Sequence, residues 1–65
     1  MTTKTTYTIE ITTRHGEPLK YSELPLEVAR DEFRIWRNFN VTVHVVVINE
    51  ATGKPVRGLR YQARR

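Results

Sequence analysis

The most hydrophobic stretch of the chain is residues 41–48, where valine, threonine or isoleucine occupies every position except His44. Side chains branched at Cβ lose rotamer freedom in a helix and suit a pleated strand, so this stretch predicts a β-strand. Successive side chains of a strand point to opposite faces. The odd-numbered valines therefore share one face, and His44, Val46 and Ile48 lie on the other, so we expect the end of this strand to be apolar on both faces.

Residues 5–13 alternate cleanly between apolar and polar side chains, with Tyr7, Ile9 and Ile11 on one face and mainly threonines on the other. This period of two predicts a half-buried strand. A turn with glycine and proline follows, and the alternation resumes at residues 19–21. The sequence therefore predicts a hairpin of two strands.

From residue 25 to about residue 38 the apolar spacing changes to three or four, which predicts an amphipathic helix. Ser22 is expected to cap its N-terminus, with Pro25 in the first turn. The apolar stripe consists of Leu26, Ala29, Phe33 and Trp36, with Val28 and Ile35 beside it. The opposite side mixes Arg30, Arg34 and Arg37 with Glu27 and Asp31, which favours a solvated face over a binding surface.

The last strand is predicted from Val56 to about Ala63, after a turn that contains Gly53. Leu59 and Tyr61 share a face of this strand, but Val56 is out of phase with them. A β-bulge at Gly58 would bring Val56 into phase, because glycine tolerates the backbone conformation that a bulge requires.

The predicted order of strand, strand, helix, strand, strand indicates a two-layer α+β domain over residues 1–65, with frayed ends at residues 1–4 and 64–65. A crossover through the helix gives a four-stranded antiparallel sheet in the order 2-1-3-4, with the helix on one face. The expected core contains Tyr7, Ile9, Ile11, Leu19, Tyr21, Leu26, Ala29, Phe33, Trp36, Val41, Val43, Val45, Val47, Leu59 and Tyr61.

The net charge of +4 lies at the end of the chain, because the residues after Glu50 carry five basic and no acidic side chains. Such a segment attracts phosphate or an acidic protein surface. The predicted nucleic-acid-binding residues are Lys54, Arg57, Arg60, Arg64 and Arg65. An edge strand that uses the same cations to prevent sheet-to-sheet aggregation is an equally common explanation.

Residues that could perform catalysis are scarce. The chain has no cysteine, its one serine is the expected helix cap, and His15 and His44 lie on separate elements. Catalysis requires a nucleophile beside a base, paired carboxylates or a metal cage. We therefore expect a non-enzymatic protein with no cofactor, no metal and no small-molecule substrate.

Two binding modes remain open for the sheet face away from the helix. Its polar residues and arginines could contact nucleic acid, and the absence of aromatic side chains there favours the backbone of a duplex over stacked single strands. Alternatively, an apolar island at Val46 and Ile48, beside His44, or an exposed edge strand could form a protein interface or a homodimer.

The first residues include no apolar leader segment, and no stretch of the chain approaches the length of a membrane span. The sequence therefore predicts a cytoplasmic protein without membrane contact. Compact, basic domains without cysteine or catalytic residues are typical of the accessory proteins that phages and plasmids encode, which makes such a role a further hypothesis.

Overall fold

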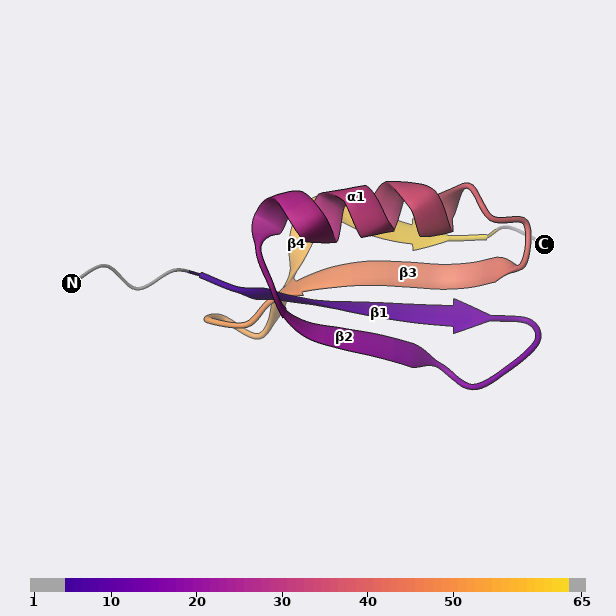
Figure 1. Cartoon of the computed structure of the whole chain (residues 1–65), viewed down its shortest axis with the longest axis horizontal. Coiled ribbons are helices and arrows are strands. Elements are labelled where there is room, and N and C mark those ends of the chain that lie inside the picture. The colour runs from indigo at the N-terminus through magenta and orange to yellow at the C-terminus, as the bar shows by residue number, and fades with distance from the viewer. Residues whose placement is uncertain (1–4, 64–65) are drawn as a thin grey trace.

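The computed structural model describes residues 5–63, so the predicted fraying of residues 1–4 and 64–65 lies outside it. It contains, in chain order, β1 (Tyr7–Thr13), β2 (Leu19–Leu24), α1 (Leu26–Arg37), β3 (Thr42–Asn49) and β4 (Lys54–Gln62). The four strands form one antiparallel sheet in the order β2-β1-β3-β4 (Figure 1). The predicted fold class and strand order are therefore confirmed.

The core lies between α1 and the two central strands. Ile9 and Ile11 of β1 and Val45 and Val47 of β3 are fully buried, and the helix contributes Ala29 and Phe33. Burial of each of the larger side chains is worth about 1.5–3 kcal/mol. The helix is too short and too polar to cross a membrane, and no other helix occurs in residues 5–63.

The predicted core is wrong for Leu19, Tyr21 and Leu26, each of which is more than a third exposed. It is also wrong for Val41 and Val43, which are half-buried and lie outside the core cluster, next to the irregular β1–β3 pairing at Thr13. Leu19 and Tyr21 point toward the helix side of the sheet, because their partners on β1 are the buried Ile11 and Ile9. The helix packs over β1 and β3 and leaves the outer strand β2 largely uncovered. Sequence periodicity identifies the apolar face of a strand but not the lateral position of the helix above it.

The predicted helix cap at Ser22 is also wrong, because this residue belongs to β2. The strand continues to Leu24, which pairs with Tyr7 after a register shift. At the shift Glu23 has a φ of 60°, in the left-handed region that non-glycine residues rarely adopt. Pro25 then precedes the helix with an extended backbone, and no side chain caps the helix N-terminus.

Candidate nucleic-acid interface

A bend in the edge strand β4 creates the candidate site. On β3, Val46 and Ile48 are two residues apart, but their partners on β4 are Arg60 and Pro55, which are five apart. Four residues of β4 therefore stand opposite one residue of β3. Gly58, within the inserted segment, has a φ of 83°. The predicted β-bulge at Gly58 is confirmed, and it contains three extra residues where a simple bulge has one.

The bend is anchored by side chains of β4 that reach the core. Val56 and Leu59 are half-buried and pack against the buried cluster, as does Tyr61 beyond the bend. Val56 thus reaches the core although it is out of phase with Leu59. The chain between these two residues must loop outward, which places the polar residues of the bulge in solvent.

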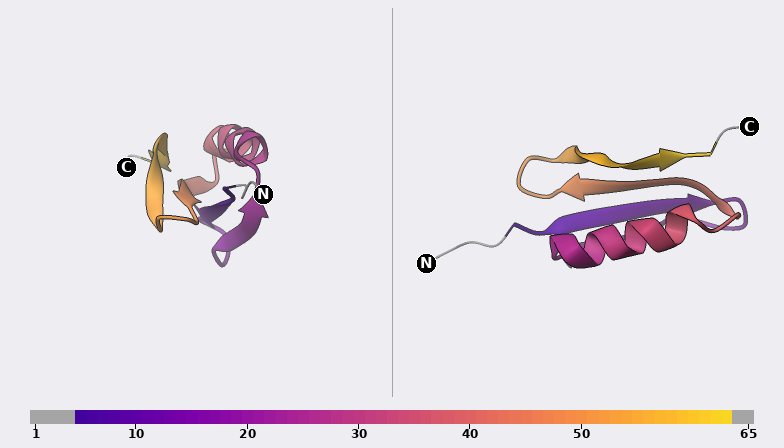
Figure 2. Two further views of the ribbon diagram at one scale, coloured as in Figure 1. Left: turned by 90° about the vertical axis from the view of Figure 1, so that its left-hand side faces the viewer. Right: turned by 90° about the horizontal axis from the view of Figure 1, so that it is seen from above.

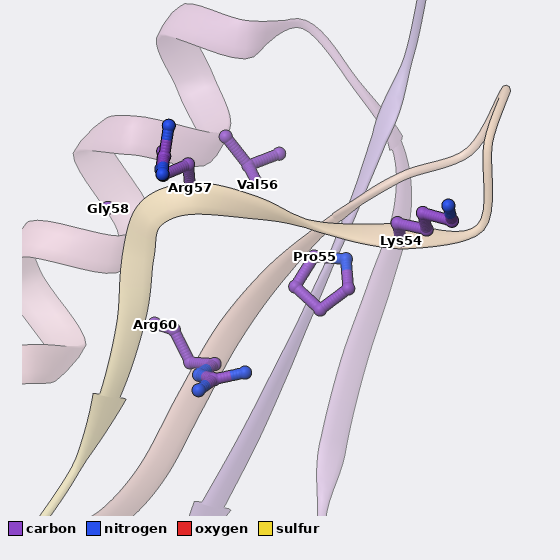
Figure 3. A pocket seen from close by; sticks show the side chains of 6 residues that line it. All are labelled: Lys54, Pro55, Val56, Arg57, Gly58 and Arg60. Carbon is purple, nitrogen blue, oxygen red and sulfur yellow. The ribbon is translucent and has the colours of Figure 1, made fainter.

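Three basic side chains line the hollow at this bend, and they project from both sides of the strand. Pro55 and Arg60 project from one side of the strand and Val56 and Arg57 from the other, with Lys54 at the hairpin end (Figure 3). Lys54, Arg57 and Arg60 are all exposed. The full lining is Lys54, Pro55, Val56, Arg57, Gly58 and Arg60, and it includes no carboxylate.

The cations of the hollow are not used in ion pairs with described residues. Within residues 5–63, the one ion pair joins Arg34 to Asp31 on the outer face of α1, with 3.6 Å between nitrogen and oxygen. On the outer face of α1, Arg30 and Arg34 line a hollow together with Glu27 and Asp31, whereas the lining of the hollow at β4 includes no carboxylate. The hollow at β4 therefore has three basic and no acidic side chains in its lining.

The nearest acidic residue along the chain, Glu50, is hydrogen-bonded to residues of β1 and β2 and of the segment just before β1. Its carboxylate accepts hydrogen bonds from the hydroxyls of Thr6 and Thr8 and from the backbone N–H of Glu23, the last at 2.8 Å. Its own N–H donates to the carbonyl of Thr6 at 3.1 Å. The Glu23 N–H, followed by the two hydroxyls, lowers the pKa of the Glu50 carboxyl below its usual value.

Sequence reasoning missed this arrangement, in which one carboxylate joins β1, β2 and the β3–β4 turn. Thr6, just before β1, and Thr8 alternate with Tyr7, so the sequence indicates that the two threonines share a face. The approach of Glu50 depends on the β1–β3 register and on the bulge at Glu23, and neither can be obtained from the hydrophobic pattern.

The structure shows how exposed the residues of the predicted protein interface are, which are His44, Val46 and Ile48. Val46 is only 6% exposed although no helix lies on its face, because its neighbours across the sheet are the longer side chains of Glu10 and Arg60. Val46 therefore offers little surface to a partner, and the interface of His44, Val46 and Ile48 stays a prediction. Ile48 and His44 are half-buried, and His44 lies between Thr12 and Gln62.

The remaining predicted site residues lie outside the described structure, and the second histidine is far from this surface in sequence. Arg64 and Arg65 follow the described residues. His15 is exposed in the β1–β2 turn. Across residues 5–63, no three histidine or carboxylate side chains come together in a way that could hold a metal ion.

Comparison of this chain with protein-family models, with curated proteins and with solved structures finds no match. The candidate site is therefore defined by its own geometry and charge.

Proposed function

We propose that this protein is a non-enzymatic module that binds the phosphate backbone of duplex nucleic acid through β4. The observation that carries the proposal is the hollow at the bend of β4, whose lining includes Lys54, Arg57 and Arg60 and no carboxylate. Arg64 and Arg65 follow β4 in the sequence. Clustered arginine and lysine side chains are the groups that neutralise nucleic-acid phosphates.

The position of the hollow suits a long, charged ligand. It lies on an edge strand, so no neighbouring strand limits access from that side. Gln62 follows Arg60 on the same face of β4 and adds a side chain that can donate and accept hydrogen bonds. A protein strand and its cations can follow a groove or a backbone in this way.

The residue types that line the hollow favour a duplex over a single strand as the ligand. Proteins that bind single strands stack the bases on aromatic side chains. The lining of the hollow contains no aromatic residue. Tyr7 and Tyr61 pack against the core on the helix side of the sheet, so they are not part of this surface. The proposed contact is therefore electrostatic and depends little on base sequence.

Fluorescence anisotropy with a labelled duplex of mixed sequence tests this function over a series of salt concentrations. Neutralisation of four or five phosphates predicts that the logarithm of the binding constant falls with that of the salt concentration with a slope of about −4. The same bases as a single strand should bind more weakly. Absence of duplex binding at low salt, or tighter binding of the single strand, would contradict the proposal.

A further inference from the structure

A second surface, on the opposite edge of the sheet from the hollow, is apolar and uncovered. Leu19 and Tyr21 of β2 are 37% and 45% exposed, although they point to the same side as the buried core. On the helix, Val28 and Ile35 are 41% and 54% exposed. We refer to Leu19, Tyr21, Val28 and Ile35 as the apolar strip.

The strip is a continuous surface between β2 and α1. Tyr21, Leu24, Val28 and Glu32 line one hollow between the two elements. Val28 and Ile35 are seven residues apart, so they lie on the same flank of the helix. Glu32 is the one charged residue of that hollow, and its carboxylate accepts a hydrogen bond from Trp36 Nε1 at 3.2 Å. The Glu32 carboxylate therefore already has one hydrogen-bond donor within the chain.

The strip lies beside a free strand edge. Because β2 is the first strand of the order β2-β1-β3-β4, one side of it has no partner strand within the described residues. Figure 2 shows β2 and β4 at the two ends of the curved sheet, with the helix on one face. A partner that adds a strand to β2 would pair its free backbone groups and cover the strip in the same contact.

We propose that this partner is a second copy of the chain, bound across a two-fold axis with the two β2 strands antiparallel. Such an axis brings each strip against the other and joins the two sheets into one of eight strands. Leu19 and Tyr21, on the helix side of β2, would then lie beside the same two residues of the second copy.

The exposed area agrees with a modest dimer. The four residues of the strip leave roughly 350 Å² exposed, and an apolar patch of about this size is often a functional surface. If about 60% of an interface is apolar, this area corresponds to roughly 600 Å² per copy, at the lower end of specific interfaces. We therefore expect a dimer with a dissociation constant in the micromolar range.

Dimerisation through β2 would not cover the proposed nucleic-acid site, because the hollow of each copy stays at an outer edge of the joined sheet. The inference therefore does not rest on the proposed function. Loss of the dimer in a variant need not reduce the binding of one chain to a short duplex.

Sedimentation equilibrium from low micromolar to several hundred micromolar chain tests the dimer. The wild-type mass should rise with concentration from 7.7 kDa toward twice that value. Ile35→Glu should raise the dissociation constant about 30-fold or more, as loss of a central interface contact does. Leu26→Glu is the matched control, since it introduces the same charge on the opposite flank of the helix, beside Thr5 and Arg30. It should dimerise like the wild type.

Circular dichroism must show that each variant is folded. If Ile35→Glu does not fold, Tyr21→Lys takes its place in the test. A wild type that stays at 7.7 kDa at the highest concentration would overturn the proposal. Equal weakening by Leu26→Glu, or no weakening by the folded strip variant, would overturn it as well.

Discussion

Pro55 and Arg60 occupy successive paired positions along β4 although four residues separate them, because their partners Ile48 and Val46 are only two residues apart. The chain accommodates this mismatch in the bulge that contains Gly58. The bulge places one cation at the inner side of the bend and another at the outer side (Figure 3). The shape of the candidate interface therefore depends on the conformation of one glycine.

Replacement of Gly58 by alanine should destabilise the protein by about 1–2 kcal/mol, which is the cost of a left-handed backbone for an L-residue. An added Cβ would meet no atom within 4 Å, so the cost is conformational alone. The free energy of unfolding in urea measures it. Gly16→Ala is the matched control, since its surroundings are equally open and its φ is not in the left-handed region. Equal effects of the two substitutions would contradict the assigned role of Gly58.

Glu50→Gln should destabilise the protein at neutral pH, with a difference that shrinks in acid. The pKa of Glu50 is lowered in the folded state from its usual value of 4.5 by the hydrogen bonds of Glu23, Thr6 and Thr8. Its stabilising contribution is thus complete above the unfolded pKa and is lost as the pH falls through the lower folded pKa. Thermal unfolding at pH 7 and at about pH 3 measures this linkage.

Glu17→Gln removes a charge from an exposed turn and is the control for Glu50→Gln. It should change the melting temperature little at neutral pH. If Glu50→Gln were as stable as the wild type at neutral pH, or if the difference grew in acid, the three hydrogen bonds would not stabilise the fold.

Thr42→Val should raise the free energy of unfolding by about 1 kcal/mol, because it removes a buried hydroxyl that has no hydrogen-bond partner among the described residues. Valine has nearly the same shape, so the packing is retained. Thr8→Val makes the same change at another buried threonine, but there the hydroxyl donates to Glu50. Urea unfolding should therefore give opposite signs for the two variants. Destabilisation by both would show that the Thr42 hydroxyl finds a partner in solution.

The sequence was sufficient to predict the elements and their order because the periodicities are strong. Isoleucines at alternate positions of β1, apolar spacings of three and four in α1, and the valines of β3 each determine one element. The mismatch between Val56 and Leu59 also predicted a bulge, which the structure contains.

The position of the helix over the sheet, the strand register and the size of the bulge could not be predicted, because hydrophobic periodicity does not encode them. The lateral position of the helix leaves Tyr21 exposed, and the neighbours across the sheet bury Val46. The strain at Glu23 and the contacts of Glu50 require a register that no local pattern reveals. For the site, the sequence identified the cations of β4, but the hollow between Lys54 and Arg60 arises only from the size of the bulge.

The central claim is that the cations of β4, and not the charge of the whole chain, bind nucleic acid. The most direct test compares two triple variants with the same change in net charge: Lys54, Arg57 and Arg60 to Gln on β4, and Arg30, Arg34 and Arg37 to Gln on α1. In duplex binding at about 0.1 M salt, the β4 variant should bind at least about a hundredfold more weakly, with a salt slope reduced by about 2 to 3. The α1 variant should stay within about threefold of the wild type, because solvated cations among carboxylates contribute little. Equal losses in the two variants, or unchanged binding by the β4 variant, would contradict the account.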